Sequence, residues 1–284
     1  MPLLGAHMSV AGGLHHAFAH LRKVKGEALQ IFTRNQRQWR AAALADEEVR
    51  LFIRAWEAAG QPPVASHDSY LINLASPKSE VADKSIHALA DELRRCAALR
   101  IPYLVMHPGA HLGTGVEEGI DLLSRNLAKA INAVPEAEGV MVLLETTAGQ
   151  GSSLGARFEE LAAIIAAAKD SHRLGVCYDT CHAFAAGYDI RTPATYWQTF
   201  ADFDRIIGLD RLRFFHLNDS IKDLSSHTDR HTHIGQGAIG LAGFRLLMND
   251  PRFVRHPMVL ETPKGEDLAE DIENLRLLRG LTAS

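Results

Sequence analysis

The stretch LGVCYDTCHAFAAGYD, residues 174–189, opens with a short run of β-favouring residues that ends on an acidic side chain, Asp179. Seven other β-favouring runs are spread along the chain, and a longer segment follows each. The eight runs are LLGAH (3–7), ALQIFT (28–33), PPVASH (62–67), YLVMH (103–107), VMVLLE (140–145), LGVCYD (174–179), RLRFFH (211–216) and PMVLE (257–261). Regular alternation of this kind predicts parallel strands joined by right-handed crossovers.

The segments between the runs show helical periodicity, most clearly at 83–100, 158–169 and 269–280. Eight strand–helix units in 284 residues favour an α/β fold of the (β/α)8 type, a TIM barrel, over an open sheet. Because no Pro/Gly/Ser-rich linker divides the chain, we expect a single barrel domain over residues 1–284.

Seven of the eight runs end on a side chain that can bind a metal ion. The carboxyl ends of barrel strands open onto one face, where barrel enzymes have their active sites. One such residue could be a cap or a packed polar group, but burying seven polar groups without partners is costly. We therefore expect them to form a metal-binding cup. They are His7, His67, His107, Glu145, Asp179, His216 and Glu261.

Imidazole and carboxylate ligands suit zinc, manganese or iron, and a four-coordinate ion would use only part of this set. More than one ion is therefore expected. A second group of ligands follows the seventh run, in the segment HTDRHTH (227–233). In an extended loop His227, Asp229, His231 and His233 would lie on one side, because side chains alternate along an extended chain.

Cys177 and Cys181 flank Asp179 and raise the alternatives of a thiolate metal site or a redox pair. No other cysteine cluster completes a thiolate site, since the chain has three cysteines in all. Cys177 lies deeper in the barrel on the side of Asp179, where a free cysteine acts as a small hydrophobic residue. We interpret both thiols as bystanders.

The formal net charge of −4 argues mildly against a nucleic-acid partner. The N-terminal segment MPLLGAHMSVAGG lacks the pattern of a signal peptide, and no apolar run reaches the roughly 20 residues that span a bilayer. We expect a cytoplasmic protein that does not associate with membranes.

Several further motifs occur in order along nearly the whole chain. They include GAHMSVAGGL (5–14), IFTRNQRQWR (31–40), HDSYLINLASP (67–77), HPGAH (107–111), ETTAGQGSSLG (145–155), FFHLNDS (214–220), DRHTHIGQGAIG (229–240) and VLETP (259–263). Together these motifs resemble those of the endonuclease IV family of apurinic/apyrimidinic-site DNA repair enzymes. This resemblance implies a barrel with three divalent metal ions, usually zinc, with manganese an alternative at one site. It also implies hydrolysis of the phosphodiester 5′ to an abasic site, which leaves a 3′-hydroxyl and a 5′-deoxyribose phosphate.

Carried onto this sequence, the resemblance assigns nine ligands and leaves His7 a supporting role. Glu145 would bridge two ions, and Glu261 would orient or deprotonate the attacking water; these two are the expected catalytic residues. The implied ligand sets are His67, His107 and Glu145 for the first ion, Glu145, Asp179, His216 and Glu261 for the second, and His182, Asp229 and His231 for the third.

The resemblance also assigns Arg37, Tyr70 and Leu71 to insertion into duplex DNA at the lesion. Three divalent ions would outweigh the formal charge of −4 and concentrate positive charge in the cup. The expected partners are therefore duplex DNA with abasic sites and DNA with blocked 3′ ends, near the nucleoid, with no obligate protein partner.

Two other functions compete with this interpretation. A sugar isomerase or epimerase on a related barrel would hold one ion with Glu145, Asp179, His216 and Glu261. Such an enzyme has no use for the remaining ligands, which a three-metal site requires. A damage-binding protein without catalysis is expected to lack a bridging ligand, yet every ligand position carries a suitable residue.

Overall fold

The eight β-favouring runs form a closed barrel of parallel strands in the computed structural model, which describes residues 1–168 and 171–282. The TIM-barrel prediction is confirmed. Around the barrel the strands follow the order β1-β10-β7-β6-β5-β4-β3-β2, so each strand lies beside the barrel strands that precede and follow it in the sequence. Their bounds are β1 Leu3–His7, β2 Ala28–Ile31, β3 Val64–His67, β4 Tyr103–Met106, β5 Met141–Glu145, β6 Leu174–Asp179, β7 Leu212–Leu217 and β10 Pro257–Leu260.

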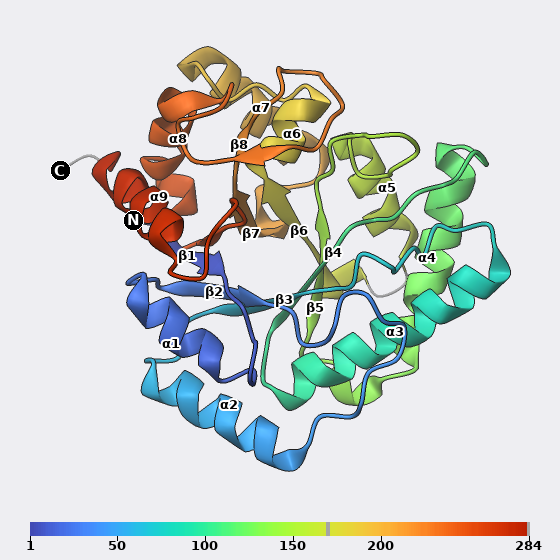
Figure 1. The fold of residues 1–284 in the computed structure, drawn as a ribbon. Helices are drawn as coiled ribbons and strands as arrows, with labels where there is room; N and C mark the ends of the chain where they lie inside the picture. The colour runs from blue at the N-terminus through green and yellow to red at the C-terminus, as the bar shows by residue number, and fades with distance from the viewer. Residues whose placement is uncertain (169–170, 283–284) are drawn as a thin grey trace.

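Helices surround this barrel (Figure 1). The helix predicted at 83–100 spans 79–98, the one at 269–280 has the predicted bounds, and the one at 158–169 ends at 167. The final predicted residue of that segment lies outside the described residues. No described helix combines the length and apolarity needed to cross a membrane. The helices are α1 His16–Lys23, α2 Asp46–Ala58, α3 Ser79–Ala98, α4 Val116–Asn132, α5 Phe158–Ala167, α6 Thr180–Ala186, α7 Pro193–Ile206, α8 Gly240–Met248 and α9 Ala269–Gly280.

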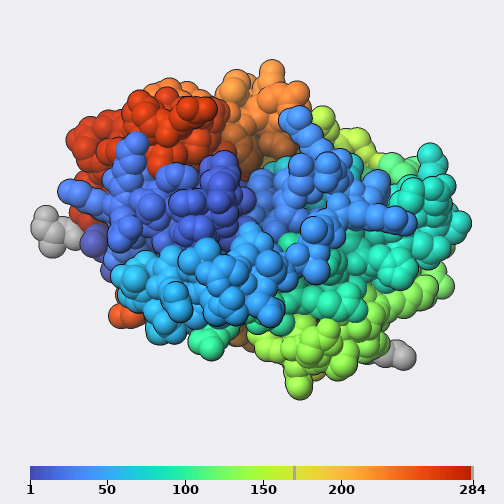
Figure 2. Space-filling view, turned by 60° about the horizontal axis from the view of Figure 1, so that its bottom comes forward, coloured from blue at the N-terminus to red at the C-terminus, as the bar shows by residue number. Residues whose placement is uncertain are grey.

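The barrel closes where the first strand meets the last. β1 pairs in parallel with β10, with Leu4 opposite Met258 and Ala6 opposite Leu260. The N-terminal (blue) and C-terminal (red) segments therefore adjoin on the surface, as Figure 2 shows. Closure leaves none of the eight barrel strands with a free edge.

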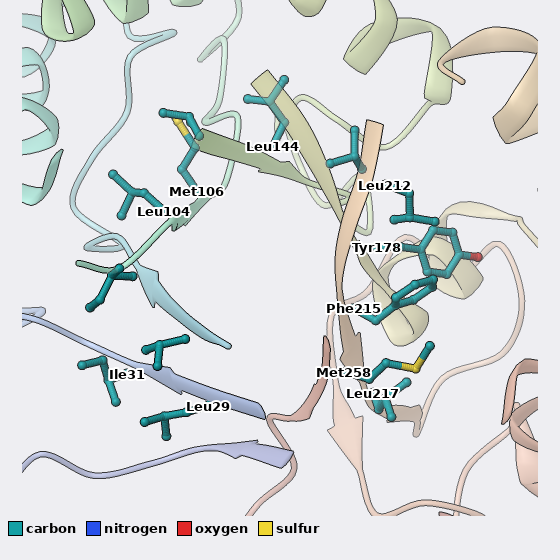
Figure 3. Close-up of a cluster of buried hydrophobic side chains, with 14 of the residues drawn as sticks. Leu29, Ile31, Leu104, Met106, Leu144, Tyr178, Leu212, Phe215, Leu217 and Met258 are labelled. Carbon is teal, nitrogen blue, oxygen red and sulfur yellow. The ribbon is translucent and has the colours of Figure 1, made fainter. Parts of the chain in front are cut away.

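The main hydrophobic core lies between the barrel and its helices. Leu29, Leu104, Leu144 and Met258 point outward from their strands into this layer (Figure 3). Tyr178 points the same way and packs on Phe200, with 5.2 Å between ring centroids. As expected from the alternation of side chains, this tyrosine faces the helices and not the barrel interior.

A second core fills the barrel interior. It consists of one buried side chain from each of seven strands: Ala28, Ala65, Val105, Leu143, Cys177, Phe214 and Val259. Two residues further along each strand, the side chain again faces the barrel axis. These next positions hold the polar residues of the cup, so the apolar layer forms its floor.

The structure differs from the sequence-based prediction at the second strand. β2 ends at Ile31 and not at Thr33, and Gln30 is the buried residue that faces the cup. A two-stranded antiparallel pair was also missed, β8 Asp219–Ser220 with β9 His231–Thr232. Two-residue strands are too short to show any periodicity in the sequence.

The interior core leads to a stability prediction. Leu143→Ala removes a fully buried side chain from the barrel interior, where neighbouring strands cannot close the space. We expect a loss of about 2–5 kcal/mol in the free energy of unfolding, measured by chemical denaturation. Ile272→Ala, at a residue of α9 that is 41% exposed, is the control and should change stability by less than about 1 kcal/mol. Equal effects of the two substitutions would contradict this packing.

Candidate metal centre

Nine polar side chains meet at the carboxyl end of the barrel. Among themselves they form three groups, in each of which the potential ligand atoms lie within 4.8 Å of one another, and a fourth group adds Cys181 to Asp179 and His231. All nine residues predicted as ligands belong to these groups, and no group includes His7. The three groups are His67, His107 and Glu145; Glu145, Asp179, His216 and Glu261; and His182, Asp229 and His231.

Glu145 joins the first two groups and is fully buried. Its Oε2 lies 3.1 Å from Nε2 of His67 and 3.2 Å from Nε2 of His107. Its Oε1 lies 3.1 Å from Nδ1 of His216 and 3.0 Å from Nδ1 of His182. Because its two oxygens face opposite sets of histidines, this carboxylate has the geometry of a bridge between two ions.

The third group is assembled from a helix and a loop. Asp179, at the end of β6, caps α6 by accepting a 2.8 Å hydrogen bond from the backbone N–H of His182. This places His182 Nε2 3.2 Å from Asp229 Oδ2 and 3.3 Å from His231 Nε2. The β8–β9 pairing holds the loop that carries His231 against the barrel.

Backbone carbonyls orient the histidines for binding a metal. His67 Nδ1 donates to the carbonyl of Asp68 at 2.9 Å, and His182 Nδ1 donates to the carbonyl of Thr146 at 3.0 Å. In both rings the Nε2 atom then faces the other ligands. Hydrogen bonds of this kind fix the tautomer of metal-binding histidines.

Two amide side chains that sequence reasoning missed also support the ligands. His216 Nε2 donates to Oε1 of Gln30 at 2.8 Å, while the amide of Gln30 donates to Glu261 at 2.6 Å. Asn218 donates to Asp179 at 2.7 Å and accepts from the backbone N–H of Glu261 at 3.0 Å. The position of Gln30 within the apolar run ALQI was a signal that its side chain is buried. The sequence has no comparable signal for Asn218.

Three histidines near the cup are not in any of the groups. His7 lies against Glu261, with 3.6 Å between Nδ1 and Oε1, which agrees with a supporting role. The expectation that His227 shares a side with Asp229 and His231 is wrong, and His233 is in none of the groups. His227 has a left-handed backbone with φ of 48°, which breaks the extended run, and it contacts the carbonyl of Ala148. His233, beyond the end of β9, contacts Asn274.

The cysteine thiols are buried and unpaired. Cys177 belongs to the floor of the cup. Cys181 Sγ lies within 4.8 Å of ligand atoms of Asp179 and His231, so it offers an alternative grouping. Burial and the nearby Asp179 raise the pKa of Cys181 to about 12, and its Sγ contacts the carbonyl of Arg230. A thiol held in this protonated state supports the interpretation of Cys181 as a bystander.

The charges in the cup fit divalent cations. In the part of the chain that the structure describes, every ion pair of Glu145, Asp179, Asp229 and Glu261 is with a histidine, and none involves lysine or arginine. Clustered carboxylates and imidazoles are the ligands that zinc and related ions prefer. The site therefore has the composition of a metal centre.

The expected DNA-contacting residues lie around the mouth of the cup. Tyr70 is 63% exposed, Arg37 is exposed and Leu71 is half-buried, so none of the three side chains belongs to the buried core. Tyr70 stands between two hollows, one of about 360 Å³ beside His107 and Asp229 and one of about 560 Å³ beside Glu261. The cup is thus open to a ligand on both sides of this ring.

The loop that carries Arg37 is held by two buried arginines. Arg34 donates to the carbonyl of Gln38 at 2.7 Å, and Arg95 of α3 donates to the carbonyls of Thr33 and Ala42. Ser69, next to Tyr70, donates to the carbonyl of Gln36 in the same loop at 2.9 Å. The two loops are therefore connected, although neither contains regular secondary structure.

Proton release provides a test of the metal centre. Burial lowers the pKa of His67, but the hydrogen bond and charge of Glu145 outweigh burial and raise the pKa to about 10. The pKa of His216 is also raised, because Glu261 and Glu145 outweigh burial. In the metal-free protein at pH 7 the ring of His67 is therefore protonated, and it must lose that proton to bind a metal.

We therefore expect zinc binding to release protons, and the apparent affinity to fall as pH falls, by about tenfold per pH unit for each displaced proton. Calorimetric titration in buffers of different ionisation enthalpy measures the release. A heat of binding that is the same in every buffer would contradict this assignment.

Comparison with known proteins shows which proteins the chain is similar to. The family described as xylose isomerase-like TIM barrel matches residues 18–278. A probable endonuclease 4 from Chloroflexus aggregans is 56% identical over 285 residues, covering 99% of this chain and 98% of its own. The crystal structure of endonuclease IV from Thermus thermophilus superposes with a TM-score of 0.86 at 38% identity, covering 99% of this chain and 98% of its own. A D-tagatose 3-epimerase-like protein shares the fold, with a TM-score of 0.73 at 19% identity, covering 98% and 96% of the two chains.

Proposed function

The chain belongs to the endonuclease 4 family of xylose isomerase-like TIM barrels, and from this premise we propose that it is a metal-dependent DNA repair endonuclease. Its substrate is duplex DNA with an abasic site, and it hydrolyses the phosphodiester on the 5′ side, leaving a 3′-hydroxyl and a 5′-deoxyribose phosphate. The observation that carries the proposal is the meeting of nine ligands in three adjoining groups at one end of the barrel.

Each group would hold one divalent ion, with zinc the expected metal. The ions would neutralise phosphate charge, activate water for attack on phosphorus and stabilise the leaving oxygen. Manganese is an alternative at one site, because sites of histidine and carboxylate accept either ion. The same chemistry would remove blocking groups from 3′ ends, because such groups are attached to the DNA through a phosphate ester that hydrolysis can cleave.

The protein's own groups prepare this chemistry before DNA binds. Glu145 faces two ligand groups at once and would keep two ions a fixed distance apart. Glu261 is bound by Gln30 through Oε1, and its Oε2 lies 3.2 Å from His216. That half-buried carboxylate is placed to orient an attacking water or accept its proton. The apolar floor below excludes bulk water, which strengthens every electrostatic interaction within the cup.

Tyr70, Leu71 and Arg37 would enter the duplex at the lesion. Their two loops are tied together by Ser69 and held by Arg34 and Arg95, so ordering them on DNA would cost little conformational entropy. A rigid wedge beside a cup of cations suits a substrate whose nucleotide must leave the base stack.

One observation favours a second function. Glu145, Asp179, His216 and Glu261 would suffice for a single-metal sugar isomerase or epimerase, and such barrels share the fold. In that case His67, His107, His182, Asp229 and His231 would have no ligand role. The five additional ligands favour the nuclease.

Incision of defined DNA tests the proposal. A duplex oligonucleotide with one abasic-site analogue is incubated with the protein before and after chelation, and the products are sized. We expect a single cut 5′ to the lesion, lost on chelation and restored by zinc. Glu145→Gln should reduce the rate by at least about 100-fold, because a neutral amide cannot bridge two cations. Intact DNA together with activity on a ketose would instead establish the isomerase.

The wedge is tested separately from the chemistry. Tyr70→Ala should weaken binding of the abasic duplex by about 1–3 kcal/mol, the contribution of one stacked aromatic residue, and so raise KM by about 5- to 150-fold. Its metal content should stay that of the wild type. Trp197→Ala, which removes a half-exposed aromatic residue of α7 outside the cup, should leave KM unchanged. Equal values of KM for Tyr70→Ala and wild type would contradict the assignment.

A further inference from the structure

Asp219 is a fully buried carboxylate that no metal group contains. Its Oδ1 accepts hydrogen bonds from the backbone N–H groups of Ser220 at 2.8 Å and Ile239 at 3.0 Å. Its Oδ2 accepts from Gly235 at 2.9 Å, Gly237 at 3.1 Å and Gly240 at 3.2 Å. One side chain therefore binds five N–H groups.

Within the described residues Asp219 has no ion-pair partner, so these N–H groups are its entire compensation for burial. Removing a buried charge from water costs several kcal/mol unless hydrogen bonds replace the lost solvation. Hydrogen bonds to an ionised carboxylate are about twice as strong as neutral ones. A carboxylate so surrounded holds the surrounding backbone in one conformation.

The backbone that it holds is the loop of residues 221–240. Asp219 lies opposite Thr232, and Ser220 lies opposite His231, in the β8–β9 pair. The loop leaves the barrel at β8, returns through β9 and ends at the start of α8 (Figure 1). Asp219 binds both the start of this loop and its last turn, and so closes it.

The fit is close enough to require glycine. A Cβ atom on Gly237 would lie 2.4 Å from the carbonyl oxygen of Ser220 and 2.5 Å from Oδ1 of Asp219. Both atoms are held in place, one by the backbone and the other by its hydrogen bonds. The loop can close on Asp219 only because residue 237 has no side chain.

We propose that Asp219 is a positioning residue for the third metal group. Asp229 and His231 both belong to the closed loop, whereas His182 belongs to α6. By fixing the loop before any ion binds, Asp219 holds Asp229 and His231 within ligand distance of His182. This inference rests on the proposed function, because it assumes that these three residues hold an ion.

The effect of Asp219 should be confined to one group. The ligands of the other two groups stand within one residue of the ends of β3, β4, β5, β6, β7 and β10, where the barrel fixes them. Weakening the loop therefore removes one ion and leaves the strand-end sites intact. A residue with a general structural role would instead affect all three sites together.

The test uses Asp219→Asn and two readouts on the full chain. Asparagine replaces one carboxylate oxygen with an NH₂ group, which cannot accept hydrogen bonds from the backbone N–H groups. At least two of the five hydrogen bonds are therefore lost. After dialysis against zinc, we expect about two metals per chain where the wild type holds about three. In the metal-free protein, hydrogen exchange at Gly235, Gly237 and Gly240 should be at least about 10-fold faster than in wild type.

Asp250→Asn is the matched control. Asp250 is another buried aspartate that caps a short turn, η4 Pro251–Phe253, just before β10 and so at the opposite end of the barrel. Its substitution should lower stability but leave the metal count and the exchange of the three glycine amides unchanged. If Asp219→Asn does not fold, Gly237→Ala takes its place in the same two measurements. The added Cβ atom would push residue 237 away from Asp219 and so weaken the closure of the loop.

Unchanged glycine exchange in the metal-free Asp219→Asn or Gly237→Ala protein would overturn the inference, as would equal loss of all three metals. A wild-type chain that holds one metal and does not incise DNA would contradict the proposed function. The exchange rates would still show whether Asp219 holds the loop, so the two failures are distinguishable.

Discussion

The burial of Glu145 at the carboxyl end of the barrel is the constraint on which the site depends. A carboxylate without solvent must have positive or hydrogen-bonding partners, and here four histidines surround it. In the metal-free state the charges of His216 and His107 outweigh burial and keep the pKa of Glu145 well below its ordinary value. Divalent ions would provide the positive charge that the same carboxylate needs when the histidines are neutral. Protons and metals therefore compete for one set of side chains.

The barrel meets this constraint through the alternation of side chains along its strands. An apolar layer that includes Leu143 and Phe214 closes the interior, and the next layer toward the open end holds Glu145 and His216. No ligand then depends on a flexible loop, except Asp229 and His231. For those two, the β8–β9 pair and the carboxylate of Asp219 provide the rigidity that strands provide elsewhere.

Much of this could be predicted from the sequence, because strand ends in a barrel converge whatever separates them along the chain. Runs that end in His67, Glu145 or Asp179 indicated the fold, and they also indicated which side chains would meet at one end of the barrel. The failures have physical causes. Gln30 was missed because β2 ends two residues early, and His227 was misplaced because a left-handed residue breaks the expected extended run. Asn218 acts through contacts between distant segments, which no local pattern records.

The proposed function requires three ions in this cup, with Glu145 shared between two of them. X-ray diffraction from crystals of the zinc-loaded protein, measured on both sides of the zinc absorption edge, locates every bound zinc ion. We expect three anomalous peaks, with Glu145 between two of them and the third beside His182, Asp229 and His231. A single peak among Glu145, Asp179, His216 and Glu261 would rule out the three-ion site and identify a one-metal enzyme on the same barrel.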